Sequence, residues 1–109
     1  MAKNFVQPGH VLTLTAPAGG VVSGNGYLIG ALFVVALISA PEGQQFEGQC
    51  TGVFRLPKTS AQAWTEGAAI YWDADKGEAT TTAAENTLIG HAAAAAANPS
   101  DYGNVRLSA

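Results

Sequence analysis

The chain has few charged residues. Of its 109 residues only 12% are Asp, Glu, Lys or Arg, roughly half the share of a typical soluble domain, whereas 48% are apolar. A small domain with so little charge exposes apolar patches, and such patches most often mark contact surfaces. We therefore expect the protein to bind copies of itself or a larger partner.

Basic residues are especially scarce. The formal net charge is −3 and the pI is near 5.1. The five cations are spread along the chain, as Lys3, Arg55, Lys58, Lys76 and Arg106. A nucleic-acid-binding domain normally carries a basic stripe, and the sequence has none. We expect no nucleic-acid partner.

Cysteine and long apolar runs are scarce as well. Cys50 is the only cysteine, so an intrachain disulfide is impossible, and we expect a small core residue there. Residues 1–5 lack the apolar stretch of a signal peptide. The longest apolar run, residues 27–40, is shorter than the roughly 20 residues that span a bilayer. We expect no membrane partner and synthesis inside the cell.

The segments that are present have β character. Residues 10–15 alternate between apolar and polar positions, and Gly-rich or Pro-containing turns follow every few residues. A chain of this length forms one domain, residues 1–109. We expect an all-β fold: a small single-domain barrel or sandwich of short antiparallel strands, with an extended N-terminal arm at 1–9 and a β core at 10–109.

The centre of the predicted core is a pair of strands at 27–40 and 45–57, joined by a turn at 41–44. Residues 32–38 are apolar at every position, so the first strand should be covered on both faces, by the rest of the fold or by another subunit. The second strand alternates as far as Gly52, where a bulge could shift its parity.

The C-terminal half predicts two further hairpins. The first has strands at 68–72 and 78–82 around an Asp/Gly turn, after a polar loop that Trp64 should anchor as an apolar plug. The second pairs residues 88–96 with 104–108. The alanine run at 92–97 favours helix by propensity. It is too short to be stable alone, so we favour strand.

Candidate metal ligands are few. His10 and His91 have no Cys or His at a chelating spacing, and we expect structural or surface histidines. Asp73 and Asp75 precede Gly77 as in part of a calcium loop, but the third ligand position and the distal Glu are missing. A hairpin turn is the favoured interpretation, with no metal.

Candidate catalytic residues are equally few. Ser23 and Ser60 are not in a nucleophile-elbow motif. We expect no enzyme activity and no cofactor. Trp64, Tyr71 and Trp72 could stack on a sugar, but a core or a subunit interface explains them as well.

Five blocks of the sequence, taken in order, resemble a known family of small phage and prophage proteins. The blocks are AKNFVQPGHVLTLTAP at 2–17, GVVSG at 20–24, GVFRLPK at 52–58, WTEGAAIYWD at 64–73 and TLIG at 87–90. The family consists of capsid decoration, or cement, proteins of tailed phages, and was long carried as a domain of unknown function. The resemblance covers nearly the whole chain.

The resemblance implies a structural protein of the virion. It would be made in the host bacterial cytoplasm, bind the outer surface of the expanded head, and stabilise contacts between subunits of the major capsid protein. A homotrimer at local threefold positions is favoured, with a homodimer as the alternative. A carbohydrate-binding β module displayed on the virion is the alternative function.

Two sets of contact residues follow as hypotheses. The N-terminal arm contains apolar residues before the first turn signal, so it could add a strand to a capsid protein's sheet edge. Its expected contact residues are Lys3, Asn4, Phe5, Val6 and Gln7. The expected subunit-interface residues are Trp64, Tyr71 and Trp72.

Overall fold

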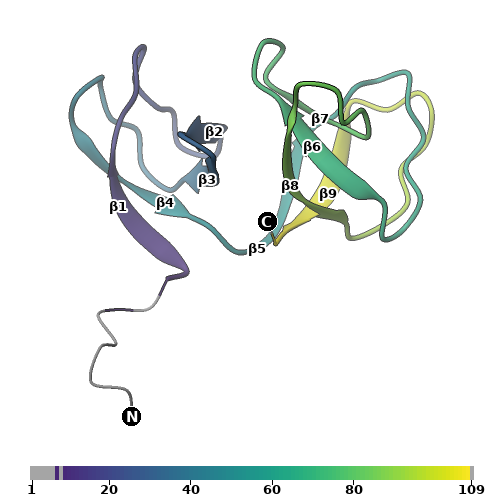
Figure 1. Ribbon diagram of the computed structural model, residues 1–109, viewed down its shortest axis with the longest axis horizontal. Helices are drawn as coiled ribbons and strands as arrows, with labels where there is room; N and C mark the ends of the chain where they lie inside the picture. The colour runs from purple at the N-terminus through teal and green to yellow at the C-terminus, as the bar shows by residue number, and fades with distance from the viewer. Residues whose placement is uncertain (1–6, 8, 109) are drawn as a thin grey trace.

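The protein is built from strands alone in the part that the computed structural model describes, residue 7 and residues 9–108. Two antiparallel sheets lie side by side (Figure 1). The strands are β1 (Val11–Thr15), β2 (Gly26–Ile29), β3 (Leu32–Ala36), β4 (Gln45–Gln49), β5 (Gly52–Pro57), β6 (Ala69–Asp73), β7 (Glu78–Thr80), β8 (Thr87–Ala92) and β9 (Tyr102–Leu107). The predicted all-β class is confirmed, with two sheets and, in the described residues, no closed barrel.

The first sheet has the strand order β1-β4-β3-β2. β1 pairs with β4 from Val11↔Gln49 to Thr15↔Gln45. Burial alternates along β1 as the sequence predicted: Leu12 and Leu14 are half-buried, and the other three residues of the strand are exposed. The edge strand therefore turns one face toward the core and one toward solvent.

The prediction of a single strand at 27–40 is wrong. The chain forms the hairpin β2–β3 instead, in which Ile29 pairs with Leu32 across a two-residue loop. Gly30 opens this loop with φ of 64°, a left-handed conformation that glycine adopts without steric cost. The turn was hidden because apolar residues flank the glycine on both sides.

The predicted single strand at 45–57 is also two strands. β4 ends at Gln49 in the first sheet, and β5 begins at Gly52 in the second sheet, where it pairs with β9. Gly52 has φ of 108°. The sequence predicted a bulge near Gly52, where the apolar-polar alternation shifts by one residue. The structure shows that the chain crosses from the first sheet to the second at this point.

The second sheet has the strand order β5-β9-β8-β6-β7. The predicted hairpin around the Asp/Gly turn is confirmed, with Asp73 paired to Glu78. The predicted pairing of the last two strands is also confirmed, as β8 with β9. The alanine run stays in strand only as far as Ala92, and Ala96 then bridges the loop at Trp64.

The hydrophobic core has two parts, and β3 contributes to both. Phe33 and Val35 pack with the buried residues of the second sheet. Val34 and Ala36 pack on the opposite face with Phe46 and the loops of the first sheet. The expectation that the apolar run at 32–38 is covered on both faces is confirmed for β3, and the same chain supplies both covers. It is wrong for Leu37 and Ile38, which follow the strand and are exposed.

Candidate functional site

The predicted capsid-contact residues Lys3, Asn4, Phe5 and Val6 lie outside the described residues. Gln7 is described and is exposed. β1, which follows, is an edge strand of the first sheet. A shallow hollow beside it is lined by Gln7, His10, Val11 and Thr13. The contact role of the arm stays a prediction.

Trp64 is the apolar plug that the sequence predicted. It is 2% exposed, and its backbone pairs with Ala96. The ring lies against Gly103, where an added Cβ would come within 2.7 Å of Cε3. Lys58 Nζ lies 5.9 Å from the ring centroid. The side chain is thus fully occupied by contacts within its own chain.

Trp72 is likewise a core residue. It is 5% exposed and packs against Phe33 of the first sheet. We expected Trp64 and Trp72 at a subunit interface, but their packing in one chain leaves them almost no surface for a partner or for stacking on a sugar. Tyr71 is half-buried and keeps some surface, so its interface role stays a prediction.

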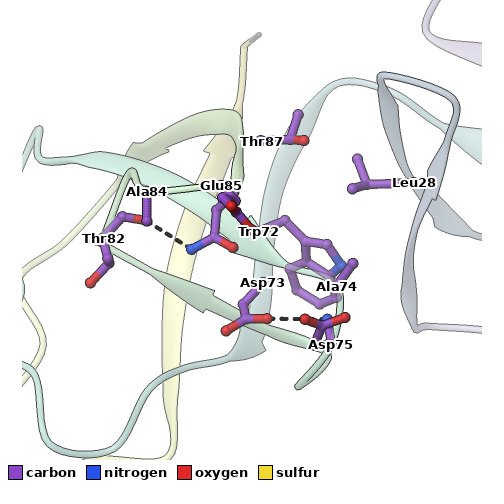
Figure 2. Close-up of a pocket in the computed structure, with 10 residues that line it drawn as sticks. Leu28, Trp72, Asp73, Ala74, Asp75, Thr82, Ala84, Glu85 and Thr87 are labelled. Carbon is purple, nitrogen blue, oxygen red and sulfur yellow. Dashed lines mark hydrogen bonds between the residues drawn. The ribbon is translucent and has the colours of Figure 1, made fainter.

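A hollow beside Trp72, which we call the acidic groove, has a volume of about 700 Å³. Figure 2 shows Leu28 of β2 on one side and residues of the second sheet on the other. The acidic residues that line it are Asp73, Asp75 and Glu85. Lys76, in the same turn, is exposed.

The Asp73 carboxylate organises the turn that borders this groove. Its Oδ1 accepts the backbone N–H groups of Asp75, at 3.1 Å, and of Lys76, at 3.2 Å. The Gly77 N–H donates to the Asp73 carbonyl at 2.8 Å. This geometry is that of a hairpin turn. Across residue 7 and residues 9–108, no group of three or more His, Cys, Asp or Glu side chains is placed to hold a metal ion.

A second exposed surface, which we call the arginine face, covers the outer side of β5, β9 and β8. Directly opposed residues in antiparallel strands project to the same side. Arg55 opposes Asn104, Val53 opposes Arg106, and Arg106 also opposes His91. All five side chains are exposed, whereas the residues between them point into the core.

The arginine face is partly preorganised by stacking. The guanidinium carbon of Arg55 lies 4.5 Å from the ring centroid of Tyr102, which opposes Pro57 at the end of the same ladder. Tyr102 is 50% exposed and Val53 is 57% exposed. A cation held over an aromatic ring keeps its charge available while its stem is fixed.

Sequence reasoning missed this face, because it is formed by pairing residues about 50 positions apart. The sequence signal for this face was the alternation of polar and apolar residues at 102–107, together with the arginines at 55 and 106. Without the register of β5 against β9, nothing in the sequence placed the two arginines on the same side of one sheet.

The candidate histidines and Ser23 contact neighbouring polar groups, and Cys50 is partly buried. His10 Nδ1 lies 3.4 Å from Thr51 Oγ1, and His91 Nδ1 lies 3.1 Å from Ser108 Oγ. The Ser23 hydroxyl donates to the Leu37 carbonyl at 3.1 Å. Burial raises the pKa of the Cys50 thiol, which disfavours the reactive thiolate.

No helix formed by the residues that the structure describes is both long and apolar enough to cross a membrane.

The fold and its surfaces define a class: a small all-β protein of two antiparallel sheets, with exposed apolar and basic side chains on one sheet face. A sequence model of the phage cement protein family matches residues 6–107. The chain belongs to this family, which is structural and bacteriophage-encoded and has its place in the virion capsid. A search of curated proteins and a search of solved structures each found no match.

Proposed function

We propose that the protein is a head decoration protein, which binds the outer surface of the expanded phage capsid and stabilises contacts between major capsid protein subunits. It would do so without catalytic activity. The observation that carries this proposal is the family match over residues 6–107. The exposed apolar and basic side chains of the arginine face are consistent with a protein that works through its surfaces.

The bound protein would stabilise the expanded capsid by mass action. A protein that binds the expanded lattice better than the unexpanded one lowers the free energy of the expanded state in proportion to that difference in affinity. Each contact with a capsid subunit can be weak, because an oligomer that engages several subunits at once gains avidity. A homotrimer fits local threefold positions, and a homodimer fits twofold positions.

The N-terminal arm is the proposed capsid-contact segment. It leads directly into β1, an edge strand whose outer side faces away from β4. An extended segment at such a position can pair with a sheet edge of another protein through main-chain hydrogen bonds. Lys3, Asn4, Phe5, Val6 and Gln7 are the residues proposed for this contact.

The stability of the shell itself tests this function. Expanded, empty capsid shells are heated with increasing amounts of the purified protein, and their disassembly temperature is followed by light scattering. We expect the temperature to rise and then level off once the sites are filled. An equal amount of a heat-unfolded sample is the control. A disassembly temperature that does not change at saturating protein would contradict the proposal.

A further inference from the structure

We propose that copies of this chain associate head to tail, with the arginine face of one copy docked on the acidic groove of the next. This inference specifies the self-contact surfaces and concerns the purified protein without capsid. It therefore stands or falls separately from the decoration function.

The first observation is the separation of charge on the molecule. Two of the five cations of the whole chain, Arg55 and Arg106, lie on the arginine face, together with His91. The three strands that form this face contain no Asp or Glu. A protein with a net charge of −3 thus has one basic, exposed sheet face.

The second observation is a surface of opposite sign elsewhere on the same chain. Asp75 and Glu85 are exposed at the acidic groove, while Asp73 is half-buried and holds its own turn. Lys76 offsets part of this charge. The groove is formed by the β6–β7 turn, the residues that precede β8, and Leu28 of β2, so it involves different strands from β5 and β9.

The third observation is apolar surface on the basic face. Val53 and Tyr102 are among the most exposed large apolar side chains of the described residues. A small hollow on this side is lined by Arg55, Tyr102 and the last four alanines of the run at 92–97. Exposed apolar side chains ringed by charge are typical of a docking surface.

These observations favour a second copy as the occupant. Each copy carries both complementary surfaces, so the acid residues of one supply the counter-charges for the arginines of the next. A contact between two different faces is heterologous, and it closes into a ring when the rotation between copies is suitable. A cyclic trimer is one such ring.

Charge reversal in matched variants tests the contact. One variant is R55E/R106E and the other is D75K/E85K, each studied by sedimentation velocity across a range of concentrations. We expect each to weaken self-association by about 100-fold or more, because like charges then face each other. Variant E42K/E66K makes the same change in net charge as D75K/E85K, at exposed positions outside the groove, and should associate like the wild type.

Two combinations then restore the contact. An equimolar mixture of R55E/R106E with D75K/E85K should associate. The face of the first variant, now acidic, meets the groove of the second, now basic, and the unchanged arginine face of the second meets the unchanged acidic groove of the first. The fourfold variant, which carries the wild type's net charge, should also associate with itself. Wild-type association should weaken between about 50 mM and about 500 mM salt. Far-ultraviolet circular dichroism checks that each variant is folded.

Several results would overturn the inference. A wild type that stays monomeric at all concentrations would do so, as would a folded R55E/R106E that associates normally. If that variant still self-associates but no longer binds expanded shells, the arginine face docks on the capsid instead. Failure of the mixture and of the fourfold variant to associate would show that the two faces do not meet.

Discussion

The ring of Phe33 packs against the ring of Trp72, with centroids 4.9 Å apart and planes inclined at 53°. Phe33 belongs to β3 in the first sheet, and Trp72 belongs to β6 in the second. The pair therefore joins the two sheets. Gly26 leaves the space that Phe33 occupies, because a Cβ added there would come within 2.8 Å of Phe33 Cε1.

Replacing Phe33 with Ala should uncouple the two sheets. The substitution removes a buried ring and leaves a cavity, at a cost of about 3–5 kcal/mol in the free energy of unfolding. Urea unfolding is followed in parallel by tryptophan fluorescence, which reports Trp64 and Trp72, and by circular dichroism, which reports both sheets. We expect coincident transitions in the wild type and separate transitions in the variant.

The exposed residue Val53 provides the control for this experiment. Val53→Ala removes an apolar side chain that is 57% exposed, so it should change the free energy of unfolding by less than about 0.5 kcal/mol. Coincident, unshifted transitions in Phe33→Ala would show that the ring pair does not couple the sheets.

Lys58 is buried and acts as a hydrogen-bonding centre for two loops. It is 3% exposed, and its Nζ donates to the carbonyls of Thr59, Ser60 and Ser100 at 2.8, 3.4 and 3.3 Å. Lys58→Met keeps most of the stem but leaves these carbonyls without their donor. We expect a loss of about 1–3 kcal/mol in the free energy of unfolding, measured by urea titration.

Lys76→Met is the matched control for that change. Lys76 is exposed in the β6–β7 turn, and its substitution should have little effect on stability. Equal stability of the two variants would mean that the buried ammonium contributes nothing.

Gly103 is required by the close approach of Trp64. A Cβ at this position would overlap the indole ring, so Gly103→Ala must displace a side chain that is 2% exposed. We expect a loss of about 1–3 kcal/mol and a change in the tryptophan emission spectrum. Gly9→Ala, where a Cβ meets nothing within 4 Å, should leave both unchanged. An unaltered spectrum in Gly103→Ala would contradict the packing described.

Deletion of residues 2–7 should weaken attachment to the capsid while leaving the fold intact. The described core begins with the strand β1, so the deletion removes none of its ladder pairs. We expect lower occupancy on expanded shells at equal protein concentration, with an unchanged circular dichroism spectrum. Replacement of the same residues by a Gly/Ser segment of equal length separates the effect of sequence from that of length. Unchanged occupancy would remove the arm from the contact.

Local patterns predicted the strands with clear alternation or clear turns. Residues 10–15 and the hairpin around Asp73 followed from period-two alternation and from turn chemistry. The hairpin β2–β3 did not, because Gly30 is embedded in apolar residues on both sides and the turn carries no polar signal. Periodicity fails where a strand is buried on both faces.

The surfaces were harder to predict than the strands. The sequence identified Trp64 and Trp72 as important apolar residues, but exposure depends on which segments cover them, and β3 and Gly103 do so from far along the chain. The arginine face needed the register of β5 against β9, a non-local pairing. Such contacts are set by the whole fold.

Co-sedimentation with capsid shells tests the decoration function most directly. The purified protein is mixed with expanded and with unexpanded shells assembled from the same phage's major capsid protein, and the pellets are quantified. We predict binding to expanded shells alone, saturating at a fixed ratio to capsid subunits. Binding to neither kind of shell, or equal binding to both, would contradict a protein that stabilises the expanded lattice.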